Sequence, residues 1–318
     1  MSKSVLIFLS LSLLTLPAQE VPAASQKIEP IYRVTVVARG VEAINYQYRS
    51  APTKIDFRGT VLLPNAKGEA SVVSRPGRTE IDARFENLEP PTRFGREYLT
   101  YVLWAISPEG SPHNLGEIIT DGSNRARLQV TTDLQAFALI VTAEPYAAVG
   151  QPSNVVTVEN KARPDTTGTI QTVQANANLL SRPSSTVQLV DQGVAAGNMP
   201  KVSLDRYEAI LEVYQAQNAI GIARAESVDR YAPEALAKAQ ESLGEAQRLL
   251  AAKHSNTKLV VQAARQATQT AEDARLIAAR LKQAELSGAA SREADSASSS
   301  ASGPEGVSHQ PDSALSHR

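Results

Sequence analysis

The sequence of 318 residues contains no cysteine. This absence excludes disulfide bonds, thiolate nucleophiles, thiolate zinc sites and lipid attachment through an N-terminal cysteine. A surplus of either charge is also missing, because 32 basic residues nearly balance 33 acidic residues and leave a formal net charge of −1. We therefore expect no nucleic-acid partner, since no overall positive field would attract phosphates.

A long hydrophobic run is missing as well. Lys3 is followed by an apolar run of a dozen residues, Val5 to Leu16, and then by Pro17 and small residues around Ala23. A membrane-spanning helix needs about 20 apolar residues, so this layout predicts a signal peptide over residues 1–23 and no stable membrane span. The mature protein is expected to be exported, and to be periplasmic in a bacterium with two membranes. The alternative is an uncleaved terminus that interacts with the membrane.

Aromatic residues are scarce, and the only tryptophan lies in the stretch Tyr98 to Ile118. Its large apolar side chains alternate, so Val102 and Trp104 would face one side of a strand and Leu103 the other. We expect both faces of this central strand to be covered. Other short alternating runs, separated by turn residues, fill residues 31–159 without interleaved helices. The pattern predicts an immunoglobulin-like β-sandwich over residues 31–159.

Part of this region resembles a known family. The residues concerned are Tyr101-Val102-Leu103-Trp104, Pro108-Glu109-Gly110, Val141-Thr142-Ala143-Glu144-Pro145 and Gln151-Pro152-Ser153. Over Tyr98 to Val158 the chain is similar to the extracytoplasmic domain of anti-sigma-K factors. The resemblance implies a sandwich domain of the cell envelope and does not extend to the sigma-binding domain of that family.

Residues 160–200 contain few apolar side chains and no sustained periodicity. We expect a linker here, with one short helix over Ile170 to Leu180, because so little apolar surface cannot offset the entropy lost on ordering. The same reasoning predicts a disordered tail over residues 287–318, which is rich in serine, alanine and glycine.

Residues 201–286 have helical periodicity. A first helix is expected from Leu204 towards Val228, a second from Pro233, and a third from Ser255 or Asn256 to Ser287–Gly288. The turn between the second and third helices is short, which predicts an antiparallel hairpin, or a three-helix bundle if the first helix packs on it. The predicted seams are rich in alanine: Leu236, Ala239, Leu243, Ala246 and Leu250, then Val260, Ala263, Ala267, Ala271, Ala274, Ala278 and Leu281.

The helical segment also resembles a known domain. The turn Tyr231-Ala232-Pro233-Glu234 and the repeated Ala-Glu/Gln-x-x-Leu pattern within Asn218 to Lys282 carry the match. This segment looks like the uncharacterised Ala-rich helical-hairpin domain often found ahead of OmpA-like domains in bacterial envelope proteins. The resemblance implies an envelope location and leaves direct binding to the cell wall open.

No catalytic constellation is evident. Ser255-Asn256-Thr257-Lys258 fits the Ser-x-x-Lys pattern of penicillin-binding enzymes, but the companion motifs are missing and a helix cap explains the same residues. His113 and Glu117 could be two metal ligands without a third. The glycines between Gly193 and Gly197 follow no buried strand and lack a lysine. We therefore expect no catalytic, metal or cofactor residues and no enzymatic activity.

Two sets of residues are candidates for binding. Arginines flank several turns and could together hold an anionic polymer such as a glycan, although solvated turn residues are the simpler explanation. Tyrosines of the helices could contact a partner, although packing between helices also explains them. The candidate residues are Arg75, Arg78, Arg93 and Arg96 for the anion, and Tyr207, Tyr214 and Tyr231 for the partner.

From these observations we expect a structural or adaptor protein of the bacterial envelope. Its partner would be another envelope protein or a second copy of the chain, bound through the helices. A cell-wall or glycan component is a further candidate partner, and the alternative function is a glycan-binding module built on the sandwich loops.

Overall fold

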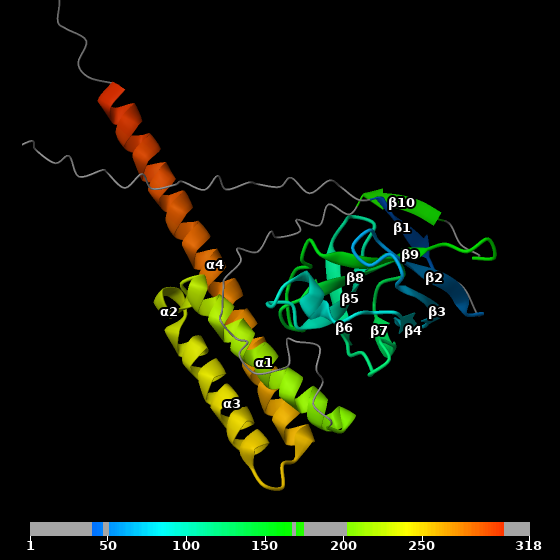
Figure 1. Cartoon of the computed structure of the whole chain (residues 1–318). Helices are drawn as coiled ribbons and strands as arrows, with labels where there is room; N and C mark the ends of the chain where they lie inside the picture. Colours follow the sequence, from blue (N-terminus) through cyan, green and yellow to red (C-terminus); the bar gives the residue numbers. More distant parts are fainter. Residues whose placement is uncertain (1–39, 47–50, 167–169, 175–201, 302–318) are drawn as a thin grey trace, which may run out of the picture. The chain divides into compact units, whose positions relative to one another are not determined.

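The computed structural model describes residues 40–46, 51–166, 170–174 and 202–301. The predicted signal peptide and the segment after Ala301 lie outside these ranges. The described residues form an antiparallel, barrel-like sheet and a C-terminal group of helices (Figure 1). The strands are β1 (Gly40–Asn45), β2 (Thr53–Gly59), β3 (Lys67–Arg75), β4 (Arg78–Glu86), β5 (Thr100–Ile106), β6 (Pro112–Ile118), β7 (Ala126–Thr132), β8 (Ala136–Glu144), β9 (Val156–Lys161) and β10 (Ile170–Gln174).

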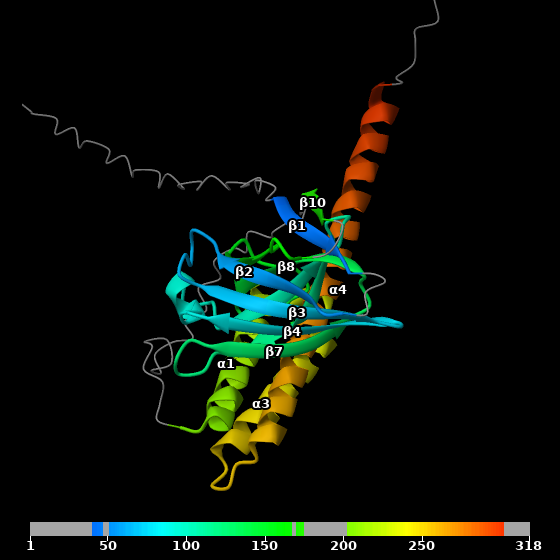
Figure 2. The same ribbon diagram turned by 90° about the vertical axis from the view of Figure 1, so that its right-hand side faces the viewer.

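All ten strands belong to one hydrogen-bonded sheet. Its main path runs β6, β5, β8, β9, β2, β3, β4, β7, and β1 with β10 branches from β8. The neighbouring strands β2, β3, β4 and β7 lie side by side in Figure 2. β6 and β7, the two ends of the path, also contact each other. The sheet is therefore barrel-like, and the two separate sheets of an immunoglobulin-like sandwich are not confirmed.

Alternating side chains give β4 one buried and one more exposed face. In β4, Ile81, Ala83 and Phe85 are buried while the residues between them are more exposed. The turn between β3 and β4 uses Gly77 at a φ of 77°, a conformation that glycine adopts without steric cost. The short helix predicted over Ile170 to Leu180 is wrong for its first five residues, and residues 175–180 lie outside the described part of the chain. Residues 170–174 form β10 instead, because they pair in register with β1, from Gly40 opposite Gln174 to Ile44 opposite Ile170.

β5 is buried on both faces, which confirms the expectation for the central strand. Tyr101 and Leu103 belong to the core inside the barrel-like sheet. Val102 and Trp104 point the other way and belong to a second core that includes helical residues. A strand covered on both sides needs apolar residues at every position, which explains why this stretch is the most apolar of the sheet.

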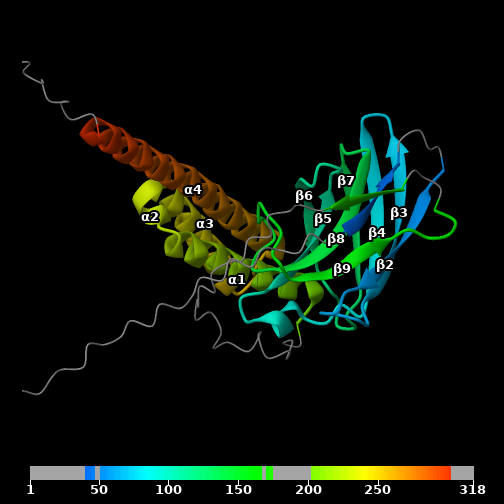
Figure 3. The ribbon, with the colours of Figure 1, turned by 90° about the horizontal axis from the view of Figure 1, so that it is seen from above.

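The helices are α1 (Leu204–Ala225), α2 (Val228–Tyr231), α3 (Pro233–Ala251) and α4 (Thr257–Ala301), and a short 3-10 helix, η1, covers Pro91–Phe94. α1 begins where predicted, and Ser203 caps it by accepting a hydrogen bond from the Arg206 N–H. α1, α3 and α4 lie side by side (Figure 3). Alanines at 0% exposure, including Ala216, Ala246 and Ala264, form their common core. No helix within the described part of the chain is long and apolar enough to cross a membrane.

The end predicted for the third helix at Ser287–Gly288 is wrong, because α4 continues to Ala301 through the first part of the predicted tail. The hydroxyls of Ser287 and Ser291 bind the carbonyl oxygens of Gln283 and Ser287 at 2.9 and 3.0 Å, so these serines satisfy their own hydrogen-bonding groups within the helix. Alanine-rich sequence tolerates one glycine at a cost of about 1 kcal/mol. α4 accordingly passes through Gly288 and projects beyond the neighbouring helices (Figures 1 and 3).

Replacing Gly288 with alanine should strengthen this last part of α4. A Cβ at Gly288 would meet no atom within 4 Å, so only the backbone entropy changes, which favours the helix by about 0.5–1 kcal/mol. Slower amide exchange around residue 288 is the expected result. Gly244, in the packed helix α3, is the matched control, because it also has free space and its substitution should raise the free energy of global unfolding instead.

Candidate functional site

The sheet and the helices share one hydrophobic core. Val102 and Trp104 of β5 belong to the same buried cluster as Ala223 of α1, Leu236 of α3 and Ala274 of α4. The small alanine side chains let the helix backbones come close to the strand. The sheet and the helices are thus joined through a buried interface, and polar side chains are buried within it.

Glu272 of α4 is the centre of the first buried polar cluster, which we call the Glu272 cluster. Its side chain is 1% exposed. The Tyr146 hydroxyl and the Gly150 N–H, both from the loop after β8, donate to it at 2.7 and 2.8 Å. Arg275 donates two more hydrogen bonds, at 2.7 and 2.8 Å, and its third nitrogen binds Glu226 at 3.1 Å. The cluster therefore ties the loop after β8 to α4 and to the end of α1.

The charges of the Glu272 cluster stabilise each other. Burial alone would raise the pKa of Glu272, but the hydrogen bonds and charge of Arg275, with those from Tyr146 and Gly150, hold it below its usual range. Hydrogen bonding to Glu272 raises the pKa of Arg275. Both groups therefore remain ionised as a buried, fully hydrogen-bonded pair.

Glu117 of β6 is the centre of a second cluster, which we call the Glu117 cluster. Its Oε1 atom accepts hydrogen bonds from the Thr100 hydroxyl at 2.6 Å and from the Gln215 side-chain amide. Arg265 of α4 lies 3.6 Å from Oε2 of Glu117 and donates to Glu212 of α1 at 2.5 Å. Four elements, β5, β6, α1 and α4, thus place polar groups around the buried Glu117 side chain.

The two carboxyl groups of this cluster, Glu117 and Glu212, face a single cation, Arg265. Burial, together with the nearby charge of Glu117, raises the pKa of Glu212 to about 9, although Arg265 opposes the shift. The side chain of Glu212 is 1% exposed, whereas that of Arg265 is 52% exposed. One guanidinium that is half in water therefore does not bring the pKa of Glu212 back to its usual range.

Side-chain amides of α1 add further links to the sheet. Gln215 accepts a hydrogen bond from the Ala147 N–H at 2.6 Å. Asn218 donates to the carbonyl oxygens of Glu97 and Pro145 at 2.8 and 3.1 Å. These bonds satisfy backbone groups that the packed helices would otherwise shield from water. They also hold α1 in one position relative to the sheet.

Beneath these contacts, a chain of hydrogen bonds runs through the sheet itself. The Trp104 indole N–H donates to the Thr142 hydroxyl at 2.8 Å, and Thr142 donates to Glu144 at 2.6 Å. The Ser153 N–H also donates to Glu144, at 2.6 Å. The only tryptophan of the chain is therefore held in one orientation on the side of β5 that faces the helices.

These polar groups are arranged for attachment. Each hydrogen bond of the two clusters joins one segment of the fold to another or orients a neighbouring side chain. Among the residues described, no group of three or more histidine, aspartate and glutamate side chains could hold a metal ion. His113 and Glu117, the candidate metal ligands, are not brought together. An irregularity between Leu103 and Trp104 shifts the pairing of β5 with β6, and Glu117 turns into the helical interface while His113 is exposed.

The other sequence candidates have simple explanations. The Asn256 side chain accepts a hydrogen bond from the Leu259 N–H at 3.4 Å, so this part of the Ser-x-x-Lys match serves as the cap of α4. The segment Gly193 to Gly197 lies outside the described residues.

The four candidate arginines do not form one cluster. Arg75 and Arg78 are opposite each other at one end of β4, and both pair with Glu80. Arg93 and Arg96 lie beyond the other end of β4, which extends about 26 Å from Arg78 to Glu86 at the usual rise of a strand. Arg93 pairs with Glu89. The prediction that the four side chains gather at one end of the domain is therefore wrong.

The three candidate tyrosines are half-buried and separated along the helices. Tyr207 lies near the start of α1, where burial and the charge of Glu117 raise its pKa. Tyr214 lies two turns further along α1. Tyr231, in α2, donates to Glu285 of α4 and stacks with Arg230, whose guanidinium carbon is 5.0 Å from the ring centre. Tyr207 and Tyr231 thus make contacts within the protein.

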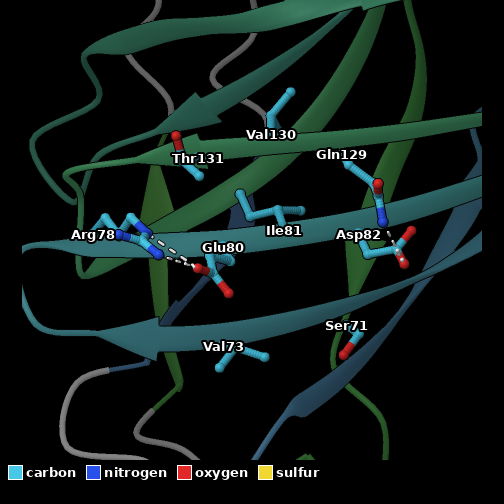
Figure 4. A pocket seen from close by; sticks show the side chains of 9 residues that line it. All are labelled: Ser71, Val73, Arg78, Glu80, Ile81, Asp82, Gln129, Val130 and Thr131. Atoms are coloured by element: carbon cyan, nitrogen blue, oxygen red, sulfur yellow. Dashed lines mark hydrogen bonds and ion pairs between the residues drawn. The ribbon is translucent and has the colours of Figure 1, made fainter.

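One shallow hollow on the outer side of β3, β4 and β7 is shown in Figure 4. Its charged groups already have partners. Arg78 donates to Glu80 at 3.0 and 2.8 Å, and Gln129 donates to Asp82 at 3.3 Å. Arg127 also binds Asp82, at 2.6 Å. This is the polar outer face of a sheet, and its lining residues offer no convergent unpaired group to a ligand.

Comparisons with protein-family models, with curated proteins and with solved structures each give no match to this chain.

Proposed function

We propose that this chain is an exported, non-catalytic protein of the bacterial envelope that acts as a structural or adaptor protein through protein–protein contacts. The observation that carries the proposal is the last part of α4. From Ala279 to Glu293 every residue is exposed, and Glu285 links this stretch to α2 through Arg230 and Tyr231. A helix that is exposed at every position over several turns is a suitable element for contact with another molecule.

The size of this helical arm, which we define as residues 286–301, supports the proposal. Its sixteen residues extend about 24 Å at the usual helical rise. Leu281, just before the arm, and Leu286, its first residue, are 47% and 58% exposed. The attached sheet and helices would position the arm, while the arm would reach the partner. Export rests on the sequence alone, and the immunoglobulin-like sandwich and antiparallel hairpin remain interpretations of the sequence that this function does not require.

Two deletions test the role of the arm. Full-length protein, a variant lacking residues 302–318 and a variant lacking residues 286–318 would be expressed in the source bacterium, cross-linked and purified. We expect a partner, or a second copy, to be recovered with the first two forms and lost with the third. Equal recovery with all three forms, or no cross-linked product from any, would rule out the arm as the contact.

Export has its own test. The protein isolated from the periplasmic fraction should begin near Ala24 when its N-terminus is determined by mass spectrometry. A chain that retains Met1 and is found in the cytosol would contradict this part of the proposal.

A further inference from the structure

The Glu117 cluster contains more negative charge than its positive group can balance. Glu117 of β6 and Glu208 and Glu212 of α1 all lie around Arg265 of α4. The other groups that face the pair, Thr100 of β5 with Tyr207 and Gln215 of α1, are neutral. Glu208 is 31% exposed and is solvated, but the side chains of Glu117 and Glu212 are 7% and 1% exposed. Water therefore cannot compensate the charges of these last two.

The hydrogen bonding of Glu117 also lacks one donor. Thr100 and Gln215 both donate to Oε1, whereas Oε2 is buried and accepts no hydrogen bond. Arg265 is 3.6 Å from Oε2, which is an ion-pair distance and longer than a hydrogen bond. A protonated Glu212 would supply the missing donor, because its Oε1 would still accept from Arg265 while its other oxygen carries the proton.

We propose that Glu117 and Glu212 form a carboxylic acid–carboxylate pair that binds one proton from solvent when α1 packs against the sheet, so that a rise in pH weakens the attachment of the helices. In the detached state the Glu212 carboxyl is solvated and loses its proton near pH ~4.3. In the attached state the pair keeps one proton well above that pH.

The sign of the effect follows from this difference. A carboxyl whose pKa is raised on folding gives its full stabilisation below the pKa of the unfolded state and loses it as the pH rises through the folded-state pKa. Between the unfolded-state pKa and the folded-state pKa, the equilibrium constant for attachment should therefore fall by up to about tenfold per pH unit. The Glu272 cluster has the opposite sign, since the lowered pKa of Glu272 makes its contribution decrease only as the pH falls.

Trp104 provides a direct probe. It is the only tryptophan, it is fully buried, and it lies in the core shared by β5 and the helices. Its fluorescence would be recorded from about pH 5 to about pH 9.5 in a fixed urea concentration just below the unfolding transition. We expect the emission maximum of the full-length protein to shift to longer wavelength as the pH rises.

The variant Glu212→Gln should abolish this shift, because the amide supplies the donor without a titratable proton. Glu117→Gln is the second variant, for use if the first does not fold, and should flatten the same profile. Glu272→Gln is the matched control, which should lower stability but keep the alkaline shift. An emission maximum of the full-length protein that does not move over the whole pH range, or a shift that persists unchanged in the folded Glu212→Gln or Glu117→Gln protein, would overturn the proposal.

Discussion

Replacing Arg275 with methionine is expected to lower the free energy of unfolding by about 3–5 kcal/mol, because it leaves the charge of Glu272 buried without its cation. The Arg275 side chain is 9% exposed and supplies two of the four hydrogen bonds that Glu272 accepts. Water cannot replace them at a carboxylate that is 1% exposed. Urea unfolding followed by circular dichroism measures the loss.

Two further variants separate the buried charge from the lost side chain. Adding Glu272→Gln to Arg275→Met should recover part of the stability, because a neutral amide costs less to bury than a carboxylate. Arg280→Met is the matched control on the same helix. Arg280 is exposed, so its substitution should change stability by no more than about 0.5 kcal/mol. Similar losses for Arg275→Met and Arg280→Met would show that the buried pair does not hold α4 in place.

Truncating Trp104 to alanine should cost about 3–5 kcal/mol, the usual range for a large aromatic residue in a packed core. Trp104 is 0% exposed and contacts the shared core, so the cavity would open between the sheet and the helices. The substitution also removes the indole donor to Thr142, whose hydroxyl would lose one partner and keep its bond to Glu144. Thermal unfolding by circular dichroism gives the change, since the variant has no tryptophan.

Leu204→Ala is a suitable control for this truncation, because Leu204 begins α1 but is 56% exposed. Its loss should be below about 0.5 kcal/mol. If Trp104→Ala cost no more than Leu204→Ala, the side chain would not be part of a tightly packed core.

Local periodicity predicted most of the strands and the starts of the helices. The alternation in β4 and the apolar residues on both faces of β5 reflect burial that any neighbouring element would impose. By contrast, β10 exists because it pairs with β1, about 130 residues earlier in the chain, and its own sequence carries little apolar signal. The same holds for the approach of β6 to β7, which depends on the curvature of the whole sheet.

The buried polar clusters were missed for a related reason. Polar residues recur on α1 at Glu208, Glu212 and Gln215, and on α4 at Arg265, Thr268, Glu272 and Arg275. Steps of three and four place each set on one side of its helix, which usually indicates a solvated surface. Here most members of both sets are buried at the interface with the sheet, although Arg265 and Glu208 keep partial contact with water, because the outer surface of β5 and β8 must also be covered. Two polar stripes with matching spacing and complementary charge were the available signal.

The Ser-x-x-Lys match and the arginine-bearing turns were singled out as candidate sites in the sequence, but in the structure their residues have other roles. Both are short patterns whose meaning depends on neighbours that are distant in the sequence. The hydrogen bond of Asn256 at the start of α4 identifies the Ser-x-x-Lys match as a helix cap, and the length of β4 separates the two pairs of arginines. Neither feature can be predicted from the spacing of the residues alone.

The position of the helices at the end of the chain has a consequence for biosynthesis. Ala274 and Ala278, which complete the core around Trp104, are made more than 130 residues after β8 begins. Until they leave the ribosome, the outer side of β5 and β8 remains open to water and to other nascent polypeptides. Ribosome-stalled chains ending before α4 should therefore bind general chaperones that the completed chain does not.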